Sequence, residues 1–343
     1  MEQVSTGANE SFKDPRTVQH DTLIAMSAPL VKGGIPYAPD DHDHQHKVGI
    51  CTSISLTQNR EKAKGRKYSP EFQYLLQKKF FDSGWWEGSS ILHALKVGKS
   101  IGFLPAELWT HTTENDRYLS YSEYAKKLQA VPANEVSRLM ALCVDKLPGY
   151  AAVNTYDPQA IAKAIHESEA GLICMYGCGD TWWTSVAGVA SWNPRDINPL
   201  RKPKTYTSGH ALIMSEFDYT SDKMQKLSNM WGKTWNLQGS ADINWSTYQM
   251  KEAWAILRTA PAPVAFKYTY NINLAFGARG NEVRMLQIGL TELGYLPKGT
   301  NGPYGPLTRS AVAKLQKDNG IVGDGANFGP KTRKLLTGLL NPA

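Results

Sequence analysis

The residue whose surroundings most favour chemistry is Cys51. It stands in the segment Gln45-His-Lys-Val-Gly-Ile-Cys-Thr-Ser-Ile-Ser-Leu, where a glycine turn leads into a run that predicts a helix. A thiol at the amino-terminal end of a helix lies near the positive end of the backbone dipole, which favours the nucleophilic thiolate. Cys51 is therefore a candidate nucleophile. The alternative is a small buried hydrophobic side chain.

A cysteine nucleophile needs a base, and the base needs a group that orients it. His210 stands directly before the apolar run 211–217, which predicts a strand, and Asn229 lies in the next such run, 227–231. A hairpin between these strands would place Asn229 beside His210. The alternative for His210 is a purely structural histidine.

Two kinds of structure must position these residues. Residues 50–145 predict mainly helices, and Asp157 with Pro158 forms the N-cap and first turn of a further helix that ends near Gly171. The short apolar runs beyond it are rich in β-forming residues and predict an antiparallel sheet or small barrel; they are 172–176, 211–217, 227–231, 241–245 and 253–257. A helical half followed by a β half is an α+β arrangement.

The chain divides at a proline-containing segment. Two prolines at alternate positions within residues 259–272 disfavour a helix and predict an extended linker. Residues 1–28 are polar and aperiodic, which predicts a loose extension. The predicted organisation is thus an extension (1–28), a first domain (29–258), a linker (259–272) and a second domain (273–343).

The second domain contains an internal repeat, called here the internal echo. The segment Tyr304-Gly-Pro-Leu-Thr-Arg309 recurs 24 residues later as Phe328-Gly-Pro-Lys-Thr-Arg333. In each copy the proline suits the first turn of a helix, and apolar residues near it recur at three- and four-residue spacing. The pattern predicts a small domain of three helices joined by glycine-rich turns.

Composition limits the class of protein. The 343 residues are 41% hydrophobic and 20% charged, as in an ordinary globular protein. No apolar run approaches the roughly 18 residues of a membrane helix, so we expect no membrane insertion. Four cysteines exclude a disulfide-stapled scaffold. The amino terminus lacks the basic and apolar regions of a secretory signal, so we expect synthesis in the cytoplasm without one.

The net charge of +7 is concentrated in the second domain, where nine Lys and Arg stand against four Asp and Glu. A basic module is typical of a polyanionic partner such as an anionic cell wall, and the alternative is an ordinary basic surface. No run of five Lys or Arg and no aromatic–basic stripe is present, which disfavours nucleic acid.

These residues resemble the papain-like cysteine peptidases. The order Cys51, His210, Asn229 matches, and Gln45 precedes Cys51 by six residues, the spacing of that family's oxyanion-hole glutamine. The segment that begins at Asn229 resembles the family's Asn-Ser-Trp-Gly-x-x-Trp-Gly-x-x-Gly; its matching residues are Asn229, Trp231, Gly232, Trp235 and Gly239. The resemblance covers roughly residues 30–258. It implies a domain of two lobes, one helical and one an antiparallel β-barrel-like lobe.

The resemblance implies acyl transfer without a metal or cofactor. Cys51 as thiolate attacks an amide carbonyl, and His210 protonates the leaving amine and then activates the deacylating water. Asn229 orients the imidazole. The Gln45 side chain and the Cys51 amide stabilise the oxyanion. Trp231 shields the Asn–His hydrogen bond and counts among the substrate-binding residues.

The sequence departs from the family pattern at several positions. Val48 replaces the first cysteine of the signature Cys-Gly-Ser-Cys-Trp, and Thr52 replaces its tryptophan. The disulfide anchored at that first cysteine in secreted relatives should therefore be missing. His210 follows Cys51 by 159 residues, beyond the usual roughly 130–150, so we expect an insertion, with 180–204 as the candidate.

The tail has a resemblance of its own. It carries Gly280-Asn-Glu-Val283-Arg-Met-Leu286-Gln287, then Gly294-Tyr295-Leu296, Tyr304-Gly305 and Leu315-Gln316, and resembles the peptidoglycan-binding domain built from a repeated helical unit. The resemblance covers about residues 273–340 and implies a module that holds a wall-degrading enzyme on its polymer. Its groove would lie near the turns of Tyr304 and Phe328, two candidate substrate-binding residues. The alternative is that both rings only pack the turns.

Together these features predict a cysteine hydrolase directed to bacterial peptidoglycan. It would cut amide bonds in wall peptides, as a bacteriophage endolysin or bacterial autolysin does, and act at the cell wall. Three alternatives stay open. They are a protease that acts on proteins with the tail as an anchor, a non-catalytic wall-binding protein, and another Cys/His hydrolase fold of the wall.

A group of histidines and a pair of cysteines are also candidate metal ligands. His42, His44 and His46 alternate, so on a strand they would face one side and could bind zinc; no third-ligand motif accompanies them, and the alternative is a solvated polar loop. Cys174 and Cys178 have no second pair at ligand spacing. We therefore interpret those two, with Cys143, as buried thiols and predict no metal site.

Overall fold

The computed structural model describes residues 8–9, 11, 17–20, 29–178, 208–220, 224–235, 238–244, 250–259, 269–297, 300 and 302–341. Contacts divide the chain into two compact units, of which the second begins with Pro263 apart from a short amino-terminal segment. The division thus falls within residues 259–272, for which the sequence predicts a linker.

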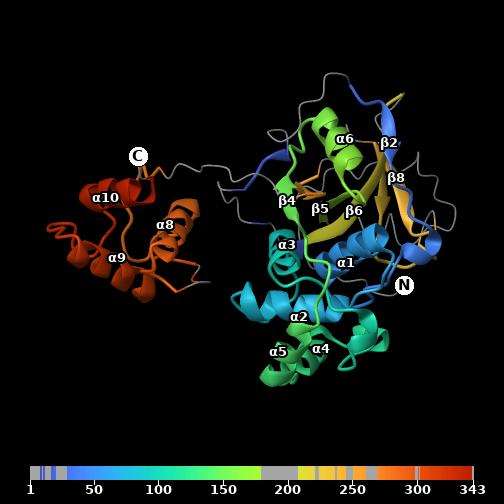
Figure 1. Ribbon diagram of the computed structural model, residues 1–343, viewed down its shortest axis with the longest axis horizontal. Helices are drawn as coiled ribbons and strands as arrows, with labels where there is room; N and C mark the ends of the chain where they lie inside the picture. Colours follow the sequence, from blue (N-terminus) through green and yellow to red (C-terminus); the bar gives the residue numbers. More distant parts are fainter. Residues whose placement is uncertain are drawn as a thin grey trace. The chain divides into compact units, whose positions relative to one another are not determined.

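The first unit has a helical lobe (Figure 1). Its helices are α1 (Cys51–Lys64), α2 (Pro70–Phe80), α3 (Ile91–Ser100), α4 (Tyr121–Gln129) and α5 (Ala133–Ala141), with short 3-10 turns η2 (Pro39–Asp41), η3 (Ala106–Leu108) and η4 (Glu114–Tyr118). Helix α1 is buried from Cys51 to Arg60 and packs against α2 and α3. Side-chain caps start its neighbours: Ser69 accepts from the Phe72 amide, and Ser90 from that of His93. The prediction of mainly helices over 50–145 is confirmed.

A sheet forms the other lobe, and nine of its strands lie in the described part of the chain. The strands are β1 (Ala8–Asn9), β2 (Lys32–Gly34), β3 (Ser89–Ser90), β4 (Gly149–Ala152), β5 (Leu172–Cys178), β6 (Ser208–Asp218), β7 (Met224–Ser228), β8 (Ser240–Asn244) and β9 (Glu252–Leu257). The main path runs β3-β1-β6-β5-β9-β4, with β2 and β7 also paired to β6 and β8 paired to β7. No pairing among the described strands joins the ends of this path, so the sheet is open. The five apolar runs that predict strands all contribute to it.

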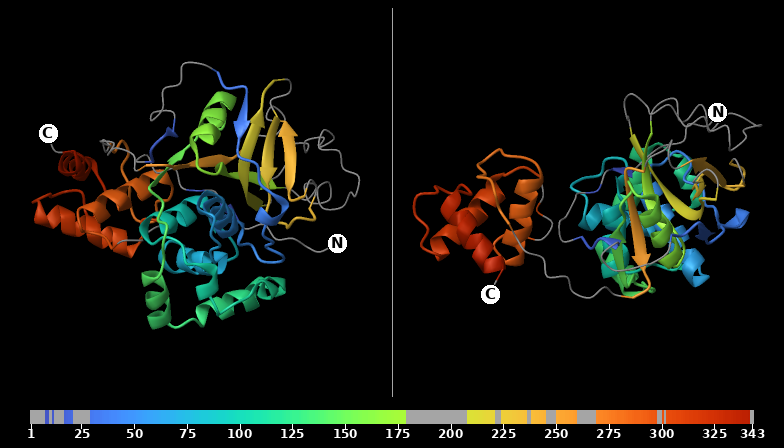
Figure 2. Two further views of the ribbon diagram at one scale, coloured as in Figure 1. Left: turned by 45° about the vertical axis from the view of Figure 1, so that its right-hand side comes forward. Right: turned by 90° about the horizontal axis from the view of Figure 1, so that it is seen from above.

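Strand β6 is the centre of that sheet. It pairs antiparallel with β5 from Leu172↔Met214 to Cys178↔Ser208, and with β7 from Ile213↔Ser228 onwards. Helix α1 packs against β5 and β6, and α6 (Pro158–Glu167) packs against β2, β6 and β9 (Figure 2). Asp157 caps α6 by accepting from the Gln159 amide at 2.8 Å, as the sequence predicts.

Part of the amino-terminal extension belongs to the sheet. Strand β1 runs parallel to β3 and antiparallel to β6, where Ala8 pairs with Gly209. The Ser11 hydroxyl donates to the Glu252 carboxylate at 3.0 Å. The prediction of a loose extension is wrong for these residues. They are held by main-chain pairing over only two residues, which leaves no alternation of polar and apolar side chains in the sequence.

The described residues of the second unit form three helices, as the internal echo predicts. They are α8 (Asn281–Glu292), α9 (Pro306–Asp318) and α10 (Pro330–Leu340), and the last two begin with proline. Two glutamines make equivalent bonds. Gln287 donates to the Thr308 hydroxyl at 3.0 Å, and Gln316 donates to that of Thr332 at 2.9 Å. The echo in the sequence is therefore also an echo in side-chain bonding.

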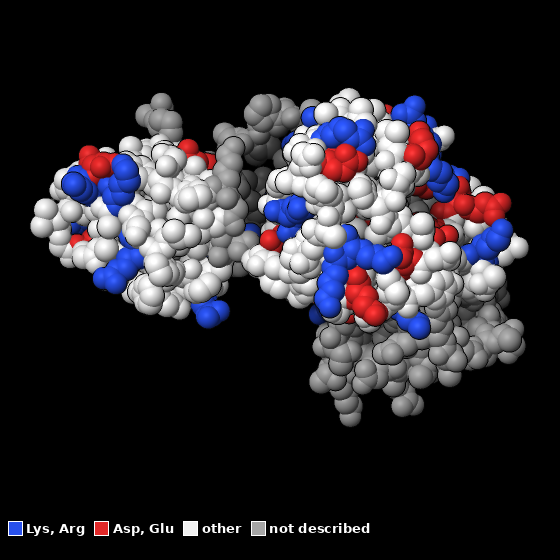
Figure 3. Space-filling model, turned by 90° about the horizontal axis from the view of Figure 1, so that it is seen from below, with Lys and Arg blue, Asp and Glu red and all other residues white. Residues whose placement is uncertain are grey.

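Charge is dispersed on the surface that Figure 3 shows. Lys and Arg side chains alternate there with Asp and Glu, and no single basic patch covers either unit on that face. Among the described residues, no helix has the length and apolar character needed to cross a membrane.

Replacing Gly209 by alanine is expected to detach β1. A Cβ atom there would lie 2.3 Å from the Ala8 carbonyl oxygen and 2.8 Å from the Met175 sulfur, both far inside contact distance. We expect the amides of residues 8–11 to exchange with deuterium roughly tenfold faster. Gly338→Ala is the control, because a Cβ there meets nothing within 4 Å. Unchanged exchange in Gly209→Ala would show that β1 does not rest on this pairing.

Candidate active site

His210 and Asn229 are in direct contact. The hairpin of β6 and β7 brings them together, and His210 Nε2 lies 2.9 Å from Asn229 Oδ1. Both side chains are fully buried. The amide oxygen can only accept, so Nε2 carries the hydrogen, and the lone pair of the neutral ring lies on Nδ1. The prediction that a hairpin sets these residues side by side is confirmed.

Asn229 is itself held in place. Its Oδ1 also accepts from the Met230 amide at 2.9 Å, and its own amide donates to the Gly239 carbonyl at 2.9 Å. On the other side, His42 Nδ1 donates to the Asn229 carbonyl at 3.1 Å. Bonds to both the backbone and the side-chain oxygen of Asn229 therefore fix the orientation of its side chain.

Cys51 is the first residue of α1 and is fully buried. Because α1 packs against β6, the strand that carries His210 runs beside the helix that begins at Cys51. The first amides of a helix point out of its end, so this position combines a thiol with the positive end of the helix dipole.

Gln45 lies in a loop that is paired with the sheet lobe. Its amide donates to the Met230 carbonyl at 3.0 Å, and the Gly232 amide donates to that of Asp43 at 3.0 Å. The side chain of Gln45 is fully buried. The following residue, His46, has a φ of 52°, a left-handed conformation that non-glycine residues seldom adopt and that is often found at functional sites.

Trp231 covers the histidine. Its ring stacks on that of His210 with centroids 5.0 Å apart, and Trp235 meets it edge-on at 5.5 Å. Trp231 is 3% exposed. This placement fits the expectation that it excludes water from the His210–Asn229 bond.

Burial governs the electrostatics of His210. Loss of solvent lowers the pKa of its imidazole to about 4, and the bond to Asn229 only partly opposes this shift. The ring is therefore neutral near pH 7 and can accept a proton at Nδ1.

A cavity of about 600 Å³ adjoins the Gln45 loop. Its wall includes His44 and His46, on either side of Gln45, and Gly232, which follows Trp231. Glu114 and Tyr118 face it from η4. The volume is in the range of small-ligand sites.

The three alternating histidines do not converge. His42 bonds to the Asn229 carbonyl, while His44 and His46 stack on each other with centroids 3.8 Å apart. His46 also lies 3.3 Å from a Glu114 oxygen. Among the described residues no group of three or more His, Cys, Asp or Glu is arranged to hold a metal ion. The solvated-loop alternative is also wrong, since His42 and His46 are buried.

Two other cysteines are poor nucleophiles. Burial raises the pKa of the Cys143 thiol to about 12 and that of Cys174 further still. Their sulfurs lie 3.6 Å from the Leu139 and Leu212 carbonyl oxygens, respectively. The Cys178 side chain and the candidate insertion 180–204 lie outside the described residues.

In the second unit, Tyr304 and Phe328 are fully buried. The Tyr304 hydroxyl donates to the Ala326 carbonyl at 3.0 Å, and the Phe328 ring meets Tyr270 edge-on at 5.2 Å. Both rings pack the core of the three-helix unit. A groove near their turns stays a prediction.

Comparison with known proteins agrees with these two halves. The structure is similar to the crystal structure of xylellain, a cysteine protease from Xylella fastidiosa, with a TM-score of 0.52 and 16% identity, covering 76% of this chain and 98% of that one. Residues 279–336 match the family described as "Putative peptidoglycan binding domain". A region of 68 residues is 46% identical to "Probable N-acetylmuramoyl-L-alanine amidase" of Bacillus licheniformis and spans 19% of each chain.

The first unit therefore has the α+β fold of the papain-like cysteine proteases. The second contains a peptidoglycan-binding domain, set after that fold in the same chain.

Burial of the two turn aromatics gives a prediction. Phe328→Ala should destabilise the second unit by about 3–5 kcal/mol, because it empties a filled core position. Tyr304→Phe should cost about 1 kcal/mol, since it loses only the bond to the Ala326 carbonyl. Calorimetry would measure both, and sedimentation with purified walls should show full binding by Tyr304→Phe. A folded Tyr304→Phe protein that fails to sediment would place its hydroxyl in ligand recognition.

Proposed function

We propose that the chain is a cysteine peptidase that cleaves amide bonds in bacterial peptidoglycan, with Cys51 as nucleophile, His210 as base and Asn229 as the residue that orients it. The observation that carries the proposal is the buried His210–Asn229 bond at 2.9 Å beside the helix that begins at Cys51. The fold of the first unit and the wall-binding match in the second support it.

Acylation follows from the tautomer of His210. Nε2 holds its hydrogen toward Asn229, so Nδ1 takes the proton of the Cys51 thiol, and the thiolate attacks the carbonyl carbon of the substrate amide. The Gln45 side-chain amide and the Cys51 backbone amide donate to the oxygen that becomes negative. His210 then returns the proton to the departing nitrogen as the C–N bond breaks.

Deacylation reverses the roles. A water molecule gives a proton to His210 Nδ1 and its oxygen attacks the thioester carbon. Collapse of the second tetrahedral intermediate breaks the C–S bond and releases the carboxylic acid, while Cys51 recovers its proton. Trp231, stacked on His210, keeps bulk water away from the bond to Asn229 throughout.

The second unit supplies the target. A module that holds the chain on peptidoglycan raises the effective concentration of wall peptides at the first unit without adding a catalytic contact. The substrate is therefore a stem peptide or cross-bridge, and the chain acts at the wall in the manner of an endolysin.

The decisive experiment is mass spectrometry of the fragments released from purified peptidoglycan by wild type and by Cys51→Ala. We expect wild type alone to produce new amino and carboxyl ends within wall peptides, because the variant lacks the nucleophile. The drop should be at least about 1,000-fold.

Sedimentation of both proteins with the walls is the control for binding. Release of the same fragments by Cys51→Ala would reject the mechanism. If wild type releases nothing while both proteins sediment, the second unit is an anchor only. Cleavage of unfolded casein with intact wall peptides would then favour a protease that acts on proteins.

Activity should have its acidic limit near pH 4. Below the lowered pKa of His210 the imidazole carries a proton and cannot accept that of Cys51, so activity is lost as pH falls through about 4 and is steady above about 5. Initial rates of fragment release at graded pH would measure this, with circular dichroism as the check on folding. A midpoint near the ordinary histidine value of about 6.5 would contradict the assignment.

A further inference from the structure

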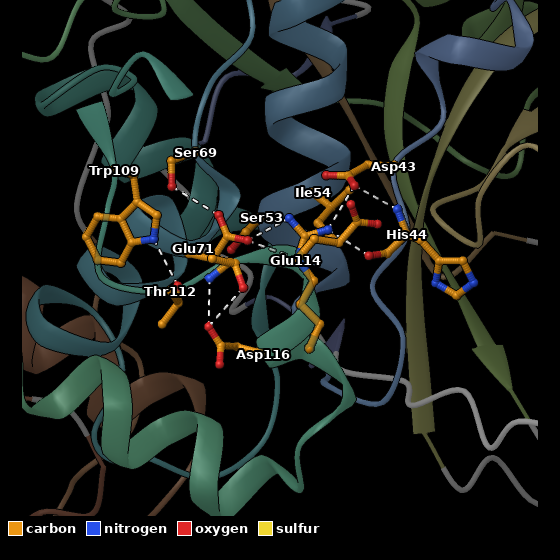
Figure 4. Close-up of polar contacts among 12 residues, drawn as sticks. Asp43, His44, Ser53, Ile54, Ser69, Glu71, Trp109, Thr112, Glu114 and Asp116 are labelled. Atoms are coloured by element: carbon orange, nitrogen blue, oxygen red, sulfur yellow. Dashed lines mark hydrogen bonds and ion pairs between the residues drawn. The ribbon is translucent and has the colours of Figure 1, made fainter. Parts of the chain in front are cut away.

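Arg117 lies at the junction of the helical lobe and the Gln45 loop. Its side chain is 5% exposed, at the carboxyl end of η4. The guanidinium donates to Glu71 Oε1 of α2 through Nε at 2.9 Å and Nη2 at 2.6 Å. Figure 4 shows Glu71 and Asp43 on opposite sides of this network, with His44 beyond Asp43.

The same guanidinium holds the loop. Nη1 donates to Asp43 Oδ1 at 2.8 Å and to the His44 carbonyl at 2.7 Å. The Arg117 carbonyl accepts from the Lys47 amide at 2.9 Å. One residue therefore contacts the chain just before and just after Gln45.

Arg117 and Asp43 favour their charged forms in this network. Burial alone would lower the pKa of Arg117, but the Asp43 and Glu71 carboxylates raise it above the usual value. Burial alone would raise the pKa of Asp43, but Arg117, together with the His44 amide and the charge of Lys67, holds that pKa below its usual range.

We infer that Arg117 is a positioning residue that fixes the Gln45 loop against helix α2, which is buried from Pro70 to Lys78, so that the Gln45 side chain meets the oxyanion. The inference rests on the proposed function. It assigns the anchoring of the Gln45 loop to the ion pairs of Arg117 with Glu71 and Asp43. The planar guanidinium of Arg117 bonds to the Glu71 carboxylate with two of its nitrogens and to the Gln45 loop with the third. A lysine ammonium cannot reproduce this geometry.

The chain offers a matched control in Arg60. Its side chain is 4% exposed, and it also joins a carboxylate to two backbone carbonyls. It donates to Glu169 at 2.8 Å and to the Asp145 and Lys146 carbonyls at 3.0 and 3.1 Å. These partners lie outside the Gln45 loop. Arg60→Lys therefore removes a similar buried fork without touching that loop.

The experiment compares full-length wild type, Arg117→Lys, Asp43→Asn and Arg60→Lys. Asp43 is 28% exposed, and Asp43→Asn leaves the bonds of Arg117 to Glu71 in place, so we expect this variant to fold even if Arg117→Lys does not. Three quantities are measured for each protein. They are the rate of cleavage of purified walls and of unfolded casein, the rate of Cys51 alkylation by iodoacetamide, and deuterium exchange at residues 43–48.

We expect Arg117→Lys to cleave about 10–100-fold more slowly, because a misplaced donor weakens oxyanion stabilisation. Asp43→Asn should show a smaller loss of about 3–10-fold. Alkylation needs no oxyanion hole, so its rate should change less than about threefold in both. Exchange at 43–48 should rise in both and stay unchanged in Arg60→Lys, with its cleavage rate within about threefold of wild type.

Three outcomes overturn the inference while wild type remains active. They are unchanged exchange at 43–48, a fall in alkylation that parallels the fall in cleavage, and an equal loss of cleavage in Arg60→Lys. If wild type cleaves neither walls nor casein, the proposed function itself fails, and the positioning role fails with it.

Discussion

The proposed site depends on a short backbone pairing between residues 43–45 and 230–232. Two bonds of 3.0 Å join these segments, from the Gln45 amide to the Met230 carbonyl and from the Gly232 amide to that of Asp43. The first segment precedes α1 and the second follows β7, so the pairing ties the helical lobe to the sheet lobe beside Asn229. Because main-chain groups make both bonds, the pairing itself does not require a particular side chain at Met230.

Much of this arrangement is predictable because its signals are local. Ser and Asp caps, prolines in first turns and apolar spacing mark the helices, and runs of β-forming residues mark β5 to β9. The hairpin that joins His210 to Asn229 follows from two consecutive apolar runs, and the Gln45-to-Cys51 spacing can be read within one segment. Strand β1 is the exception, since a pairing of only two residues through the main chain leaves no alternation of polar and apolar residues in the sequence.

The supports of the site could not be predicted for a different reason. Arg117 bonds to Glu71 and Asp43 across 46 and 74 positions of sequence, and His42 bonds to Asn229 across 187. No regular spacing in the sequence marks two residues that bond over such distances. Each partner taken alone is of a polar or charged type that is usually found at the surface. The sequence placed His42 in a candidate metal cluster, yet its role is to hold the Asn229 carbonyl. The buried Glu71 carboxylate and the partly buried Asp43 carboxylate have an explanation only once the fold places Arg117 between them.

The tie between Arg117 and Asp43 has a chemical consequence for how the site is kept intact. Hydrogen bonds and opposite charges tie Arg117 to Asp43 and to the His44 carbonyl, and none of these contacts needs an oxidant to form. An ion pair forms as the chain folds, and thiol reductants leave it untouched. Its weakness is acid instead, because the pair stabilises the fold above the ordinary carboxyl pKa and is lost only as pH falls through the lowered pKa of Asp43. The anchoring of the Gln45 loop by this pair therefore depends on pH and not on redox potential.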